Sequence, residues 1–347
     1  MIFSLHSLRH RLALEWGARS VVLLYHRIAE PETDPWNLAV TPAHFAEHMT
    51  VLRQRTALVP LRALPESALQ RATRRGVAVT FDDGYADNFH AALPALENGD
   101  IPATFFIITG AIGGDRFWWD RLAELVLLPG TLPEHLVLHV GDRDYEWHLG
   151  DSARYDEDSF ARNRAWRASA PSPGPRQTLF LELWRLVRAL PTGEQSTVIE
   201  SFAACVTHDA TDGVTHGATR TAPGRPMTVA ELASMAVHPL VEMGGHTVSH
   251  PRLTDLSAAE QQREIAGGRS QLGSIIGRPV TSFSYPFGSA GDFNSDSVTA
   301  VQRAGFERAC ANYAGRVSAR TDPYRMPRIY VRDSDGSTFE RQLATWL

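Results

Sequence analysis

The sequence predicts an α/β fold built on a mostly parallel sheet or a barrel. Short apolar runs, typical of strands buried on both faces, alternate with segments that begin at helix-capping residues. This alternation holds towards both ends of the chain and is interrupted between residues 113 and 226. It is typical of parallel sheets whose strands are joined by helices. The length of 347 residues suits one large domain, or a domain that carries an insertion.

The first third of the chain begins the alternation. The apolar run at residues 21–25 ends at His26 and is predicted to be a buried strand. Thr41 followed by Pro42 predicts a helix start, because threonine caps the first turn and proline fits the first helical position. The elements expected here are strands over residues 21–25, 77–81 and 103–109 and helices over residues 42–53 and 85–97.

The last third repeats the pattern. Ser257 and Glu260 have the spacing of a capping box, which predicts a helix that extends towards Ile276. The elements expected here are strands over residues 241–243 and 280–285 and helices over residues 258–276 and 295–304. Together, residues 1–112 and 227–347 are assigned to one domain that carries the site.

Residues 113–226 are predicted to be a largely helical insertion. Helices are expected near residues 119–128 and over residues 177–190, separated by a stretch rich in proline and glycine at residues 170–175. The second helix has leucine and valine along one face, which needs a partner surface. The insertion is expected to form a lid, a substrate wall or a plain packing unit.

Composition narrows the function. A formal net charge of −5 argues against nucleic acid or an anionic membrane as the main partner. The 34 basic residues are all arginine, which excludes Schiff-base chemistry on lysine and a P-loop lysine. Neither a signal peptide nor a transmembrane segment is readable, so a cytoplasmic location is expected.

Polar or turn-forming residues stand at the carboxyl ends of four predicted strands. They are His26, Asp82-Asp83, His246 and Tyr285-Pro286. In βα-barrels, this end of the strands is where active sites are assembled from several loops. We therefore expect these residues to lie in one site.

The aspartates and histidines are candidate metal ligands. Adjacent Asp82 and Asp83 point in different directions if the strand persists to its end, so that one can face a metal and the other a water. His246 and His250 reach one ion if they lie in one helical turn. Three such ligands and an open position make a hydrolytic zinc site. The alternatives are a turn or helix cap for the carboxylates and a structural histidine pair.

Two motifs in this order resemble those of the polysaccharide deacetylases with a NodB homology domain, carbohydrate esterase family 4. Residues 80–84, Thr-Phe-Asp-Asp-Gly, resemble the first motif, and residues 246–250, His-Thr-Val-Ser-His, resemble the H-S/T-x-x-H motif. The resemblance implies a distorted (β/α) barrel of the NodB type. By position it also implies that Asp83, His246 and His250 bind a divalent metal, and that Asp82 is the general base for the water activated there.

The family's third motif, R-x-P-Y, is altered in this chain. Residues 284–287 read Ser-Tyr-Pro-Phe, so serine replaces the arginine that orients the base. Arg328 is the predicted replacement beside Asp82, with Arg325 as the runner-up and a surface salt bridge as the alternative reading. Contacts to the substrate or to its oxyanion are expected from Leu24, Tyr285, Pro286 and Phe287.

The family's last motif, a C-terminal Leu-His with the general acid, is absent because no histidine follows His250. Leu24-Tyr25-His26 resembles that motif moved to the front, as in circularly permuted members similar to poly-N-acetylglucosamine deacetylases. A barrel tolerates such a permutation because its first and last strands are neighbours. His26 is then the predicted general acid, and Leu24 lines the pocket for the acetyl methyl group.

The resemblance implies a metal-dependent enzyme that removes N-acetyl groups from amino sugars of a carbohydrate. Zinc is expected from the ligand types, with cobalt, nickel or iron as alternatives. A non-catalytic carbohydrate-binding relative and a metal hydrolase of another amide stay open. A glycoside hydrolase is disfavoured, because its two carboxyl groups stand about 5 to 9.5 Å apart, a separation that neighbouring residues rarely provide. An iron oxygenase uses two histidines and one carboxylate, but the additional Asp82 favours hydrolysis.

Overall fold

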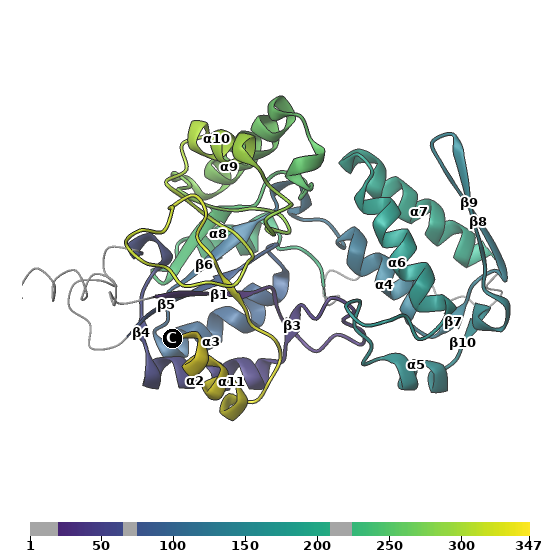
Figure 1. The fold of residues 1–347 in the computed structure, drawn as a ribbon, viewed down its shortest axis with the longest axis horizontal. Helices are drawn as coiled ribbons and strands as arrows, with labels where there is room; N and C mark the ends of the chain where they lie inside the picture. The colour runs from purple at the N-terminus through teal and green to yellow at the C-terminus, as the bar shows by residue number, and fades with distance from the viewer. Residues whose placement is uncertain (1–19, 65–74, 209–223) are drawn as a thin grey trace, which may run out of the picture. The chain divides into compact units, whose positions relative to one another are not determined.

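The computed structural model describes residues 20–64, 75–208 and 224–347, and its contacts divide the chain into two compact units (Figure 1). Unit 1 comprises Met1–Ala29, Val40–Gly113 and Met227–Leu347, and unit 2 comprises Glu30–Ala39 and Gly114–Pro226. This division differs from the expected one in that residues 30–39 cluster with the inserted segment. Within the described ranges, we find no helix with the length and apolarity needed to cross a membrane.

Unit 1 is built on a parallel sheet, in which the described strands follow the order β13-β12-β11-β6-β5-β1-β14, with β4 beside β5. Its strands are β1 (Val21–Tyr25), β4 (Ala57–Leu58), β5 (Gly76–Phe81), β6 (Ala103–Ile107), β11 (Val241–Gly245), β12 (Ser282–Ser284), β13 (Arg308–Cys310) and β14 (Ile329–Tyr330). The short strands β2 (Arg27–Ile28) and β3 (Ala39–Val40) form a separate pair. The predicted α/β fold with a parallel sheet is confirmed.

The sheet curls into a distorted barrel. The segment before β14 bonds to the edge strand β13. The N–H of Met326 donates to the carbonyl of Ala309 at 2.9 Å, and the carbonyl of Met326 accepts from the N–H of Ala311 at 2.8 Å. At its other side β14 pairs with β1 in the register Leu23 to Ile329. The first strand of the chain, β1, and the last, β14, are therefore neighbours, as the permuted arrangement requires.

Helices of unit 1 cover the outer face of the sheet. They are α2 (Pro42–Arg55), α3 (Leu93–Gly99), α8 (Val229–Ala236), α9 (Ala258–Ile276), α10 (Ser295–Arg303) and α11 (Gly336–Trp346), with shorter turns η1 (Leu61–Ala63), η3 (Asn88–Ala92), η4 (Thr109–Ala111) and η6 (Leu253–Asp255). The caps predicted at Thr41 and at Ser257 with Glu260 are present. The helix expected over residues 85–97 is instead a π-type turn, η3, that leads into α3.

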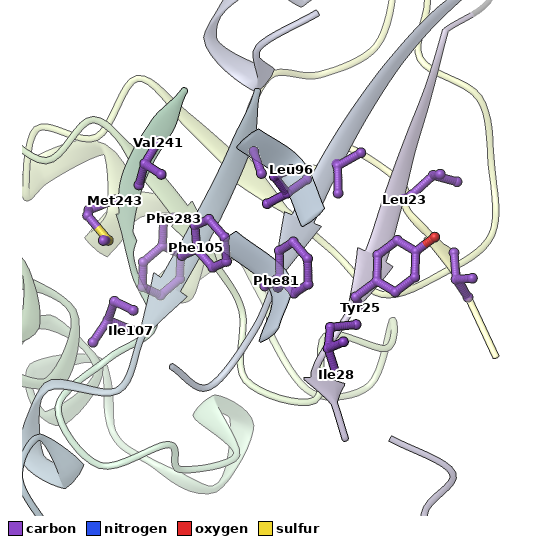
Figure 2. Packing of buried hydrophobic residues seen from close by; sticks show 14 of the residues in the cluster. Leu23, Tyr25, Ile28, Phe81, Leu96, Phe105, Ile107, Val241, Met243 and Phe283 are labelled. Carbon is purple, nitrogen blue, oxygen red and sulfur yellow. The ribbon is translucent and has the colours of Figure 1, made fainter. Parts of the chain in front are cut away.

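The core of unit 1 lies between the sheet and these helices. Leu23, Tyr25, Phe81, Phe105 and Met243 point from successive strands into one apolar cluster (Figure 2). Because side chains alternate along a strand, the residues between them point to the inner face of the barrel. The helices thus bury the outer face of the sheet. The candidate site residues lie on the inner face and in the loops that follow the strands.

Unit 2 is helical as expected, but it also contains strands that the sequence analysis did not predict. Its elements are α4 (Trp118–Leu127), α5 (Glu157–Asn163), α6 (Pro175–Arg188), α7 (Thr192–His208), β7 (Gly130–Thr131), β8 (His135–Val140), β9 (Arg143–His148), β10 (Arg154–Tyr155) and η5 (Gly150–Ala153). Strands β8 and β9 form an antiparallel hairpin, and β7 pairs with β10. Leu136 and Leu138 of the hairpin pack with Leu122, Val126 and Leu183 of the helices.

A buried arginine ties the elements of unit 2 together. The guanidinium of Arg176 donates to the carbonyls of Val126 at 3.0 Å, Gly130 at 2.8 Å, Ser152 at 2.9 Å and Ala153 at 2.7 Å. Burial lowers the pKa of Arg176 to about 10, so the group stays charged at neutral pH. Charge-assisted bonds to four carbonyls satisfy its donors and join α6 to α4 and η5.

Candidate active site

Asp82 and Asp83 follow directly after β5. The strand ends at Phe81, and the N–H of Asp82 still donates to the carbonyl of Tyr25 at 3.0 Å. Asp83 then adopts a left-handed conformation with φ of 73°. The expected alternation along a persisting strand is therefore not what separates the two side chains. The turn at Asp83 does so, and such a conformation in a residue other than glycine marks a constrained site.

His246 and His250 lie in a loop after β11, so the helical turn expected for them is wrong. Thr247 and His250 have positive φ values of 65° and 59°, and the Thr247 hydroxyl accepts from the N–H of His250 at 2.9 Å. Glu264 of α9 accepts from both N–H groups of residues 248–249, at 3.0 and 2.9 Å. The loop is thus tied to a helix of the barrel, which fixes both imidazoles.

Gly244 and Gly245 belong to β11 and precede the turn that carries the histidines. A Cβ at Gly244 would collide with the ring of Phe106, and one at Gly245 would lie 2.9 Å from the ring of Phe306. The two glycines therefore allow aromatic side chains to pack against both faces of the strand.

Asp83, His246 and His250 form a compact group of potential metal ligands. One ligand atom from each lies within 4.8 Å of the others. Oδ1 of Asp83 lies 3.5 Å from Nε2 of His246 and 3.6 Å from Nε2 of His250. His246 Nδ1 donates to the carbonyl of Ser284 at 2.7 Å, which leaves Nε2 as the ligand atom. Tetrahedral zinc places ligand atoms about 3.3 Å apart, so the donor set fits a zinc-like ion.

Asp82 is held by Arg328 rather than by the metal ligands. The guanidinium donates from Nη1 to Oδ1 at 2.7 Å and from Nη2 to Oδ2 at 2.6 Å. It also donates to the hydroxyls of Ser284 at 2.8 Å and Thr80 at 3.3 Å, and Arg328 is only 1% exposed. The runner-up Arg325 is exposed and does not contact Asp82. A bidentate pair of this kind fixes the carboxylate in direction as well as in charge.

Charges in the site shift several pKa values. Burial raises the pKa of Asp82, but the charge and hydrogen bonds of Arg328, together with the charges of His246 and His26, outweigh burial and hold it well below its usual range. The pKa of Asp83 is lowered, because contacts with His246 and His250 exceed the effect of burial. Burial and the charge of His246 lower the pKa of His250 to about 3, whereas the two carboxylates raise the pKa of His246 against burial. Both carboxyl groups are therefore ionised at neutral pH.

His26 lies beside this group, at the end of β1. Its ring packs against that of Tyr330 with centroids 5.2 Å apart, and Asn88 donates to its carbonyl at 2.8 Å. Burial lowers the pKa of His26, and the charges of Asp83 and Asp82 oppose this shift only in part. Nδ1 is buried and has no hydrogen-bond partner among the residues that the structure describes.

Tyr285 does not join the site. Its ring stacks on Phe293 with centroids 4.0 Å apart, and its hydroxyl donates to the carbonyl of Tyr324 at 3.0 Å. The N–H of Tyr285 is also used, since it donates to the carbonyl of Cys310 at 3.1 Å. The side chain thus belongs to the apolar core, and the contact to substrate expected of it finds no support in this arrangement.

The other expected contact residues lie closer to the ligands. The ring of Phe287, whose φ is 60°, packs on His250 with centroids 4.8 Å apart. Pro286 is buried and accepts from Gly288 in a tight turn that carries Phe287. Leu24 is fully buried on β1, two residues before His26 and on the same face of the strand.

Four residues around the site were not identified from the sequence. They are Thr80, Ser284, Tyr330 and Glu264. Thr80 was accessible to sequence reasoning, because it lies two residues before Asp82 and therefore on the same face of β5. The sequence shows Ser284 only as the replacement of the motif's arginine. No local signal connects Glu264 to the loop of residues 248–249 that it binds, or Tyr330 to His26.

Comparison with known proteins matches part of this chain to one family. Residues 70–129 and 213–309 match the sequence model of the family described as polysaccharide deacetylase. Over 130 residues the chain is 28% identical to YxkH of Bacillus subtilis (strain 168), a protein named for that family. The match spans 36% of this chain and 45% of that relative. The matched ranges include Asp82 and all three potential metal ligands, whereas His26 and Arg328 lie outside them.

Solved structures show the same fold at low sequence identity. The deacetylase PplD of Streptococcus pyogenes, solved in complex with acetate, aligns with a TM-score of 0.51 and 18% identity over 95% of this chain and 99% of its own. IcaB of Ammonifex degensii aligns with a TM-score of 0.53 and 16% identity over 95% of this chain and 97% of its own. A polysaccharide deacetylase of Bacillus cereus aligns with a TM-score of 0.55 and 15% identity over 95% of this chain and 69% of its own.

Proposed function

This chain belongs to the polysaccharide deacetylase family, and we propose that it hydrolyses N-acetyl groups from amino sugars of a polysaccharide or glycoconjugate. One observation carries the proposal. A buried carboxylate, Asp82, is held ionised by Arg328 next to a three-residue group that fits a divalent metal, with His26 beside both. Amide hydrolysis needs a base for water, an acid for the amine and stabilisation of an oxyanion, and this arrangement offers a group for each.

Asp83, His246 and His250 would hold the metal. A divalent ion there supplies Lewis acidity, which lowers the pKa of a water molecule and polarises the amide carbonyl. One carboxylate and two imidazoles suit zinc first, and cobalt, nickel or iron also fit this donor set. The hydrogen bond from His246 Nδ1 to Ser284 orients that ligand, and Glu264 does the same for the loop that carries His250.

Asp82 would act as the general base. Its pKa is well below the usual range because of Arg328, so the carboxylate is ionised and can accept a proton from the attacking water. Oδ2 of Asp82 lies 3.9 Å from Nε2 of His246, which places the base at the edge of the ligand group rather than inside it. Arg328 would orient the carboxylate in place of the motif arginine, whose position Ser284 occupies in this chain.

His26 would act as the general acid. It lies on the loop after β1, where the permuted Leu-His motif places it, and its backbone is fixed by Asn88. A proton delivered from the imidazole to the departing amine converts a poor leaving group into a good one. Phe287 is half-buried against His250, which suits the apolar face of a sugar, and Leu24, fully buried two residues before His26, would form the wall behind the acetyl methyl group.

The test is acetate release from N-acetylglucosamine oligomers and from a panel of other N-acetylated glycoconjugates. The protein is analysed for metal and then assayed alone, with a chelator, and with zinc or cobalt added back. Metal-dependent acetate release is expected. Full metal occupancy without release from any substrate would favour a carbohydrate-binding relative, and release from non-carbohydrate amides alone would favour a different amide hydrolase.

A further inference from the structure

The hairpin of unit 2 carries a second group of potential metal ligands. In β8 the residues Leu136, Leu138 and Val140 are buried, so the alternating residues between them face solvent. In β9 the matching exposed positions are held by acidic or histidine side chains. The register pairs on this face are His135 with His148, Val137 with Glu146 and His139 with Asp144.

Three of these side chains converge. One ligand atom from each of His135, Glu146 and His148 lies within 4.8 Å of the others. Nε2 of His135 is 3.2 Å from Oε2 of Glu146, and the two imidazole rings are stacked with centroids 4.4 Å apart and planes 8° apart. Tetrahedral zinc needs donor atoms about 3.3 Å apart, and each imidazole binds in the plane of its ring, so the two stacked rings would have to tilt towards a common ion. His135 and Glu146 are about half exposed, which leaves such rotations free.

The frame beneath these side chains is rigid. Six consecutive residue pairs join β8 to β9, and the buried leucines anchor β8 to the core of unit 2. His135 and His148 are opposite each other, whereas Glu146 lies two residues from His148 on the same face. The backbone positions of the three donors are thus set before any ion binds, which reduces the ordering that binding requires.

We propose that His135, Glu146 and His148 form a peripheral binding site for a divalent transition metal such as zinc, copper or nickel. Two imidazoles and a carboxylate are the donors that these ions accept, and an exposed face leaves at least one coordination position open to solvent. The site clips the two strands of the hairpin together. It shares no residue with the group in unit 1 and does not depend on the proposed deacetylase activity.

The neighbouring pair on the hairpin offers a matched control. Nδ1 of His139 lies 2.7 Å from Oδ1 of Asp144, on the same exposed face and with the same chemistry. This pair lacks the third donor, because Val137 stands opposite Glu146 between the two groups. Replacing His139 therefore removes an exposed histidine from the hairpin without removing a ligand of the proposed site.

The experiment compares zinc stoichiometry, after equilibrium dialysis, in the wild-type chain, in a His135→Gln/His148→Gln variant and in His139→Gln. The double variant is expected to bind one zinc fewer than wild type, and His139→Gln the same number. Cu²⁺ provides a second readout, because electron paramagnetic resonance reports nitrogen ligands. The nitrogen-coordinated signal should fall by one copper site only in the double variant, while the signal from His246 and His250 remains. Glu146→Gln, which keeps both imidazoles, is expected to weaken binding by about tenfold or more.

These variants lie on an exposed face, so circular dichroism and unchanged acetate release are the checks that they remain folded. Equal zinc stoichiometry in wild type and in the double variant would overturn the proposal. Equal losses in the double variant and in His139→Gln would also overturn it, since they would reflect non-specific binding by exposed histidines.

Discussion

Two groups of two histidines and one carboxylate lie in the described parts of the chain, and their surroundings differ sharply. In unit 1, Asp83 and His246 are buried at the end of a parallel sheet. In unit 2, His135, Glu146 and His148 are exposed on an antiparallel hairpin. The two groups therefore offer the same kinds of potential ligand. Ligand type alone does not distinguish a catalytic site from a site that only binds a metal.

The two groups differ in the charged residues that surround the potential ligands. The buried group has Asp82 beside it, fixed by the bidentate guanidinium of Arg328, and His26 nearby. Burial reduces the screening of these charges by water, so their interactions are stronger than they would be on a surface. Beside the exposed group, on the same face of the hairpin, lies the solvent-exposed pair of His139 and Asp144. Under the proposed mechanism, catalytic capacity would come from Asp82 and His26 rather than from the ligands.

Metal removal should have the largest effect and should separate the two groups. A chelator is expected to reduce acetate release to background, and added zinc should restore it, because the Lewis acid is lost and regained. The His135→Gln/His148→Gln variant should show the same activity and the same sensitivity to the chelator. An activity that disappears with the hairpin ligands would contradict this separation.

Asp82→Asn should lower turnover by about 10²- to 10⁴-fold, because an amide cannot accept the proton from water. Metal content should stay at the wild-type level, since Asp83, His246 and His250 are unchanged. The matched change on the hairpin, Asp144→Asn, should leave turnover unaltered. Loss of metal from Asp82→Asn would show instead that Asp82 is a ligand.

His26→Ala should lower turnover by about 10²-fold, because the amine would leave without a proton donor. The effect should fall on acetamides more than on esters of acetate, whose alkoxide leaves more readily, so the assay compares both substrates. His139→Ala is the exposed control. Equal rates for His26→Ala and wild type on acetamides would remove His26 from the mechanism.

Arg328→Lys should lower turnover by about 10- to 100-fold with metal retained, because lysine keeps the charge but cannot form the two parallel bonds to Asp82. Arg325→Lys is the control of the same chemistry at an exposed position. If the two variants behaved alike, the orienting role of Arg328 would be wrong.

The regular parts of the fold could be predicted because they obey local rules. Buried strands read as apolar runs, and caps such as Ser257 with Glu260 mark helix starts. The hairpin in unit 2 was missed, although residues 135–140 alternate between polar and apolar side chains, because the helices on either side dominated the interpretation of that region. Its register, and hence the group of His135 with His148, depends on pairing that single-sequence reasoning did not supply.

The site was predictable in its residue types but not in its backbone. The spacing of residues 246–250 suggested a helical turn, whereas the structure has a loop with two positive φ values stabilised by Glu264. Such conformations depend on partners distant in sequence. Arg328 was a sequence-based candidate, and its contacts with Asp82, 246 residues away, come from the curl of the sheet. The ring of Tyr285 was assigned to the site and packs in the core instead.

The most direct test is to measure acetate release and metal content together, on the same preparations of wild type and Asp82→Asn, with N-acetylglucosamine oligomers and the wider substrate panel. The account predicts metal-dependent release by wild type, and equal metal with little or no release by the variant. Equal release by both proteins, or metal-loaded wild type that releases acetate from no N-acetylated carbohydrate, would contradict it.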